Sequence, residues 1–177
     1  MTQLGRRWSV GRLLVVVLWL LGALLQIQEA YAAGKKVSIT GKLDAIQSRV
    51  VMAPGDNPQH EVTLTSRRDV WQSADPDWNN IQTHHVIYAD VTDGTGTTRG
   101  NVVQVRPNGD KTFTAFEGMV KTVTKPDGSR AVMTEGKWWL TGGTGKFTGI
   151  TGGGTYKGTP GAAPAVEYEV EGEYEIK

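Results

Sequence analysis

The stretch VEYEVEGEYEIK, residues 166–177, decides the fold of this chain. Every even position from Val166 to Ile176 is aliphatic, aromatic or glycine, and every odd position is charged. Successive side chains of a β-strand point to opposite faces, so this period of two predicts a strand with one buried and one solvated face. A helix would instead spread the five glutamates around its circumference.

The same alternation recurs near residue 37, and further strand-like runs lie between. Val37, Ile39 and Gly41 begin an apolar series that continues to Ala45, with polar residues at the positions between. We interpret residues 94–100 as a polar loop, and no mature segment has a convincing helical pattern. About eight strands predict an all-β chain, and we favour an antiparallel β-barrel because closure removes exposed strand edges. The other expected strands are 61–65, 83–92, 101–106, 111–124, 130–141 and 147–156.

Residues 111–141 allow a prediction of strand register. Lys125-Pro126-Asp127-Gly128 is typical of a hairpin turn. A turn centred near Pro126 places Glu117 opposite Glu135 and Phe116 opposite Gly136. A slip of one residue would exchange the two faces. The even-numbered face is the more apolar one and is predicted to line the barrel, with Phe116, Gly118, Val120, Val132, Gly136, Trp138 and Leu140.

Glycine is abundant, at 23 of 177 residues. The dipeptide Glu-Gly recurs at 117–118, 135–136 and 171–172. Each copy places a glutamate on the solvated face and a glycine on the core face. An inward glycine relieves crowding in a small barrel and lets an aromatic ring such as that of Phe116 lie over the backbone.

The first 32 residues have the pattern of an export signal. Three arginines precede an uncharged apolar run at residues 13–25, and Ala30-Tyr31-Ala32-Ala33 follows. This order predicts a signal helix over residues 1–32, cleaved after Ala32 or alternatively after Ala33. The barrel domain then spans 33–177 and is periplasmic or secreted, with no membrane contact after cleavage. The alternative is a retained single-span anchor, although the run is shorter than the roughly 20 residues that a span needs.

Charge and cysteine content exclude several classes of function. The chain has 19 Lys and Arg against 18 Asp and Glu. Without Arg6, Arg7, Arg12 and Glu29 of the signal, 16 basic and 17 acidic residues are left. No basic surface that would attract nucleic acid is therefore expected. The absence of cysteine excludes disulfides, thiolate metal sites and a cysteine nucleophile.

The segment Gly142-Gly143-Thr144-Gly145-Lys146-Phe147 resembles a stretch near the end of the barrel in allene oxide cyclases and dirigent proteins. Residues 148–156 and 171–176 are similar to small exported bacterial proteins with that barrel, most of them uncharacterised. The resemblance covers roughly residues 111–177. It implies an eight-stranded antiparallel barrel whose lumen can hold a hydrophobic ligand. No catalytic residue of the family can be transferred to this chain.

Three classes of function follow from a barrel of this kind. We expect a non-catalytic binder of a small apolar ligand, without a cofactor. The alternatives are a cofactor-free cyclase or isomerase and a structural envelope scaffold. A lumen of about 300 Å³ or more favours a ligand, and a buried titratable group touching it favours an enzyme. Whether the protein is an enzyme, and its oligomeric state, stay open. The residues expected to contact a ligand are His85, Trp71, Trp78, Phe116 and Trp138.

Each candidate side chain has a simpler structural interpretation. His84 and His85 are strand neighbours that point to opposite faces, so no metal site is predicted. His85 points inward if Ile87 does. Trp71 and Trp78 bracket a loop that either caps a ligand-binding lumen or plugs one end of the barrel. Glu117 and Glu135 either form a carboxylate pair that serves as a general acid, or lie on the solvated outer face where Lys121 and Lys137 screen them.

Overall fold

The computed structural model describes residues 34–160 and 166–177. The expected signal helix over residues 1–32 and its cleavage site lie outside these ranges. Lys35–Lys177 form one compact unit. Among the described residues, no helix is long and apolar enough to cross a membrane.

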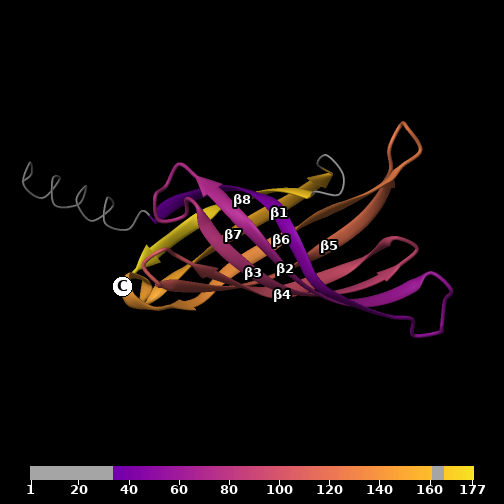
Figure 1. The fold of residues 1–177 in the computed structure, drawn as a ribbon, viewed down its shortest axis with the longest axis horizontal. Helices are drawn as coiled ribbons and strands as arrows, with labels where there is room; N and C mark the ends of the chain where they lie inside the picture. Colours follow the sequence, from indigo (N-terminus) through magenta and orange to yellow (C-terminus); the bar gives the residue numbers. More distant parts are fainter. Residues whose placement is uncertain (1–33, 161–165) are drawn as a thin grey trace, which may run out of the picture. The chain divides into compact units, whose positions relative to one another are not determined.

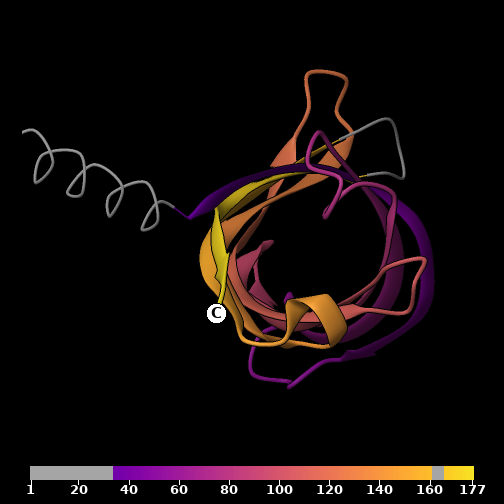
Figure 2. The ribbon, with the colours of Figure 1, turned by 90° about the vertical axis from the view of Figure 1, so that its left-hand side faces the viewer.

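The described residues form one antiparallel sheet that closes into a barrel-like ring (Figures 1 and 2). Each strand pairs with its neighbours in the sequence, and β1 pairs with β8 to close the ring. The prediction of an all-β chain with about eight antiparallel strands is confirmed. The strands are β1 Lys35–Met52, β2 His60–Ser73, β3 Ile81–Thr92, β4 Thr95–Val105, β5 Lys111–Thr124, β6 Arg130–Gly143, β7 Ile150–Pro160 and β8 Val166–Ile176, with a 3₁₀ turn, η1, at Gly145–Phe147.

The alternation in the last strand has the predicted consequence. Val170 and Tyr174 are buried, whereas the glutamates at 169, 171, 173 and 175 are exposed. β8 pairs with β1 from Lys35 opposite Tyr174 to Lys42 opposite Glu167. The buried face of β8 therefore continues into the buried Val37 and Ile39 of β1.

The alternation in β1 changes its phase after residue 43. The register between β1 and β2 shifts between Leu43 and Ala45, and again between Ile46 and Ser48. An extra residue in one strand turns the following side chains to the other face. Ala45, which the sequence places on the inward face, is exposed, and Ile46 faces the lumen instead.

The register predicted for the β5–β6 hairpin is wrong by two residues. Glu117 lies opposite Lys137, and Phe116 lies opposite Trp138. The cause is the turn, which is centred on Asp127 and not on Pro126. Lys125 donates to the main-chain oxygen of Ser129 across it, and Gly128, with φ +81°, donates to that of Lys125. Because the shift is even, each side chain stays on its predicted face. Phe116, Val120, Val132 and Trp138 all line the lumen as expected.

Two expected boundaries are also wrong. Residues 95–100 are not a loop but the first half of β4. Asp93 and Gly94 both have positive φ, at 52° and 76°, and so form a two-residue turn that matches the strand twist. Phe147 belongs to η1 and not to the following strand, which begins at Ile150.

The ring has two different ends. We call the end with the 74–80, 106–110 and 144–149 connections the plugged end, and the end with the β1–β2, β3–β4 and β5–β6 turns the open end. At the plugged end Trp78 and Phe147 are almost fully buried beside Ile81 and Ile150. At the open end, the hairpins β1–β2 and β5–β6 extend farthest (Figure 1).

Inward glycines lie beneath large aromatic rings. A Cβ atom on Gly100 would lie 2.7 Å from Phe116 Cζ, and one on Gly172 would lie 2.6 Å from Trp138 Cζ2. At distances this short, the ring or the strand would have to move to accommodate any side chain. The prediction that inward glycines make room for aromatic rings is confirmed, although Phe116 lies over Gly100 and not over Gly136.

This packing predicts that the most crowded inward glycines are sensitive to substitution. A Cβ atom on Gly154 would lie 1.9 Å from the main-chain oxygen of Glu171. We expect Gly154→Ala to lower the free energy of unfolding by about 1–3 kcal/mol, because the backbone of two strands must move apart. The control is Thr155→Ala on the outward face, which should cost less than about 1 kcal/mol. Equal urea midpoints for the two variants would contradict this packing.

Candidate functional site: the barrel lumen

The lumen contains a cavity of about 430 Å³. Towards the plugged end it is lined by Ile39, Trp71 and Trp78. Towards the open end its lining includes Ile46 and Val132, which are 56% and 43% exposed. Apolar side chains in contact with both cavity and solvent mark the open end as the route into the lumen.

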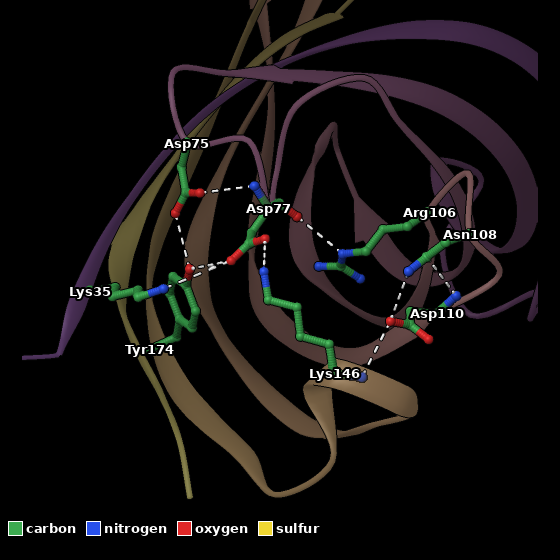
Figure 3. A network of polar contacts seen from close by, with 8 residues as sticks. All are labelled: Lys35, Asp75, Asp77, Arg106, Asn108, Asp110, Lys146 and Tyr174. Carbon is green, nitrogen blue, oxygen red and sulfur yellow. Dashed lines mark hydrogen bonds and ion pairs between the residues drawn. The ribbon is translucent and has the colours of Figure 1, made fainter.

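A polar network fastens the plugged end (Figure 3). The hydroxyl of Tyr174 donates to Asp75 Oδ2 at 3.0 Å, and Asp77 pairs with Lys146 of η1. Lys35 approaches Asp77 at 3.9 Å. Burial is the largest single influence on Asp77 and opposes its charge. The bond and charge of Lys146, the charge of Lys35 and the bond from Tyr174 together outweigh it and hold the pKa of this carboxyl below its usual range. The loop that carries Trp78 is thus tied to β1, η1 and β8.

Arg106 fills the space beneath this loop. Its guanidinium carbon lies 3.6 Å from the centre of the Phe147 ring and 5.1 Å from that of Trp78. Its Nε donates to the main-chain oxygen of Asp77 at 3.1 Å. Burial lowers the pKa of Arg106 to about 10, so the group stays charged at neutral pH. The cation lies over both aromatic rings and so joins the loop of Trp78 to Phe147 of η1.

The middle of the lumen wall carries a buried charged cluster. Arg67 and Asp69 lie two residues apart on the inward face of β2, and His85 lies on the adjacent strand β3. Asp69 Oδ2 is 3.1 Å from a terminal nitrogen of Arg67 and 3.0 Å from His85 Nε2. These are ion-pair approaches without aligned hydrogen-bond geometry. The Asp69 side chain is fully buried, and those of Arg67 and His85 are at least nine-tenths buried.

Two further side chains hold this cluster. Thr83 Oγ1 lies 2.9 Å from His85 Nε2 and donates to the main-chain oxygen of Asp69 at 3.2 Å. The other end of Arg67 donates to the hydroxyl of Tyr168 and stacks over its ring at 4.5 Å. Burying an ion pair is costly. Charges kept at the wall of a cavity are typical of a functional site.

The electrostatics of the cluster keep the imidazole neutral. Burial lowers the pKa of His85, and the nearby positive charge of Arg67 acts in the same direction, while Asp69 opposes them. The charges of Arg67 and Asp69 offset each other, so the wall is polar but has no net charge.

The opposite wall of the lumen is aromatic. The rings of Phe116 and Tyr156 meet edge to face with centres 5.7 Å apart. Trp138 donates from its indole nitrogen to the main-chain oxygen of Glu171 at 3.1 Å. Its neighbour Trp139 is exposed, as strand alternation requires. The aromatic surface suits a flat apolar ligand.

All five residues that the sequence singles out line this cavity: His85, Trp71, Trp78, Phe116 and Trp138. Trp71 lies on β2 and not in the loop, while Trp78 lies in the loop that plugs the end. His85 points inward together with Ile87, and His84 is exposed on the other face, 3.0 Å from Ser66 Oγ.

Sequence reasoning missed Arg67, Asp69 and Tyr168. The expected strand at 61–65 ended too early, because the charged residues at 67–69 do not look like a buried strand face. A signal was present: Thr63, Thr65, Arg67, Asp69 and Trp71 follow the period of two, and all five line the cavity.

The other polar candidates lie outside the lumen. Glu117 and Glu135 are exposed on the outward face, as predicted. Their neighbours across the strands are lysines, with Lys137 opposite Glu117 and Lys157 opposite Glu135.

Within residues 34–160 and 166–177, no three acidic or histidine side chains form a group that fits a metal ion.

Comparisons with known proteins give no relative of this chain: no family model, curated protein or solved structure matches it.

The pKa values of His60 and His85 are expected to be shifted in opposite directions. The pKa of His60 is raised by its bonds to Asp56 and Asp90, while burial lowers that of His85. A pH titration followed by NMR should place the midpoint of His60 above 6.5 and that of His85 below 6.5. His85→Gln assigns the resonance.

The sign for stability follows from proton linkage. The unfolded chain protonates residue 85 at a higher pH than the folded one, so His85 makes the free energy of unfolding fall as the pH drops below about 6.5. His60 acts oppositely, and its contribution fades as the pH rises through its raised pKa. A midpoint for His85 above that of His60 would contradict this assignment.

Proposed function

We propose that the protein binds one small, largely apolar molecule in the lumen of the ring. The observation that carries this proposal is the cavity of about 430 Å³ with its aromatic wall. Ligand sites in proteins typically measure about 300–1,000 Å³ and combine apolar linings with a few polar groups. A structural scaffold would need no such cavity, because an eight-stranded barrel can be filled by its own side chains.

The two ends of the ring support the same proposal. The plugged end is closed by Trp78, Arg106 and the ion pairs of Asp77. The open end exposes Ile46 and Val132 above the cavity. A molecule would therefore enter at the open end and stop against Trp71 and Trp78.

Kinship and location are part of this proposal. We propose an allene oxide cyclase-like barrel, on the basis of the Gly142–Phe147 resemblance and the ring of eight antiparallel strands. We also propose export to the periplasm or beyond, on the basis of the signal-like residues 1–32.

An apolar fluorescent probe, N-phenyl-1-naphthylamine, tests lumen binding. Ala89 lines the cavity on β3, so Ala89→Trp should fill the lumen and weaken probe binding at least about ten-fold. Ala115 lies on β5 outside the cavity lining, so Ala115→Trp is the matched control and should bind as the wild type does.

Two outcomes would contradict lumen binding. One is a wild-type protein that gives no saturable probe fluorescence. The other is equal loss of binding in both tryptophan variants. Native mass spectrometry of protein purified from its own host complements the test, because a co-purifying lipid-like mass would identify the ligand class.

A cofactor-free cyclase or isomerase is the second candidate, because His85 and Asp69 touch the cavity. A buried imidazole beside a carboxylate is a suitable general base. We expect such an enzyme to convert a compound of an apolar host extract into an isomer with unchanged mass and altered retention time. His85→Gln should abolish the conversion, and His84→Gln on the outward face should not. Conversion that persists in His85→Gln would exclude this role.

A further inference from the structure

The polar cluster on β2 and β3 determines which nitrogen of His85 carries the proton. Nε2 lies between two oxygens, Thr83 Oγ1 at 2.9 Å and Asp69 Oδ2 at 3.0 Å. Thr83 already donates its single hydroxyl proton to the main-chain oxygen of Asp69. Thr83 Oγ1 therefore offers a lone pair along the hydrogen bond to Nε2, and the negative charge of Asp69 at 3.0 Å attracts the same proton. The favourable arrangement puts the proton on Nε2.

Proton placement on Nε2 leaves Nδ1 with a lone pair. A neutral imidazole has one donor and one acceptor nitrogen. Among residues 34–160 and 166–177, no group makes a hydrogen bond to Nδ1 of His85. The side chain is 7% exposed and lines the cavity. Burial lowers the pKa of His85, which favours the neutral ring.

The charges beside His85 disfavour an acidic ligand. Arg67 is engaged at both ends, by Asp69 Oδ2 at 3.1 Å and by the hydroxyl and ring of Tyr168. Its charge is thus offset by Asp69 and is not available as a free anion site. A carboxylate would also meet the lone pair of Nδ1 and gain no hydrogen bond there.

We infer that Asp69 holds His85 as the Nε2–H tautomer, so that Nδ1 accepts a hydrogen bond from a neutral hydroxyl group on an otherwise apolar ligand. This inference rests on the proposed lumen binding and specifies its ligand class as a hydroxylated aromatic or alicyclic molecule. Phe116, Tyr156 and Trp138 supply the apolar wall for its ring. Asp69 acts here as a positioning residue, because it contacts the ligand only through His85.

Three probes with one ring system test the hydroxyl: 2-naphthol, 2-methoxynaphthalene and 2-naphthoate. The methoxy compound keeps the oxygen but cannot donate, and the naphthoate is negatively charged. Competition against N-phenyl-1-naphthylamine should show 2-naphthol binding about ten-fold tighter than either of the others, as expected for one buried hydrogen bond.

The variant Asp69→Asn tests the role of the carboxylate. The amide of asparagine can donate to Nε2, which moves the ring proton to Nδ1 and removes the acceptor. We expect the preference for 2-naphthol over 2-methoxynaphthalene to fall below about three-fold. Glu135→Gln makes the same change of charge on the exposed outer face and should keep the full preference.

The tautomer itself is measured by NMR of the wild-type protein labelled with ¹⁵N. Two-bond correlations of the imidazole distinguish Nε2–H from Nδ1–H, and this readout does not depend on how the Asp69 variant folds. The Nδ1–H tautomer in the free wild-type protein would overturn the inference.

The binding outcomes separate the two proposals. If all three naphthalene probes bind with equal affinity, lumen binding stands and the hydroxyl preference is wrong. If 2-naphthoate binds most tightly, the ligand is an acid and the inference is also wrong. If neither the naphthalenes nor N-phenyl-1-naphthylamine bind, lumen binding itself is wrong.

Discussion

Close contact between inward glycines and aromatic rings sets the dimensions of the lumen. Phe116 lies over Gly100 and Trp138 over Gly172, at distances that leave no space for a β-carbon. The rings consequently lie against the wall and do not cross the centre. The same aromatic residues in a ring without those glycines would occupy the lumen, as in barrels that are filled by their own side chains. The cavity exists because aromatic residues and glycines lie next to one another around the ring.

The buried cluster of Arg67, Asp69 and His85 lowers the stability of the fold, and its position at the cavity wall indicates why it is there. Asp69 and Arg67 leave water for a site where Asp69 Oδ1 and Arg67 Nε have no hydrogen-bond partner among the described residues. Apolar residues of similar volume would pack there at lower cost. The cluster is adjacent to the cavity and orients His85, which is the arrangement that selective recognition of a polar group requires. The free-energy cost of burying these charges is consistent with a role in function.

The contrast between the two ends gives the lumen a direction. The ion pairs of Asp77 hold the plugged end (Figure 3), together with the guanidinium of Arg106 over the Phe147 ring and the buried Trp78. In the described part of the open end, hairpin turns and half-exposed apolar side chains lie above the cavity, with exposed ion pairs such as Arg49–Glu61. Local opening is easiest where few buried contacts hold a segment. Motion that admits a ligand should therefore be confined to the open end, while the floor stays rigid.

The sequence by itself determined the number of strands and most of their inward faces, because a period of two is a local property of each strand. It predicted Val170 and Tyr174 as buried, and it placed Trp138 and Phe116 on the inward face although the expected hairpin register was two residues off. It also identified five residues that line the cavity. These results needed no knowledge of which strand lies beside which.

Only the tertiary structure decided what depends on strand pairing. The meeting of Asp69 with His85 arises from the β2–β3 register, and the proton on Nε2 follows from Thr83 and Asp69 together. The tie between Asp77 and Lys146 joins residues 69 positions apart, and the cavity depends on all eight strands closing into a ring. Local alternation carries no information about such distant pairings, because they arise only when the sheet closes.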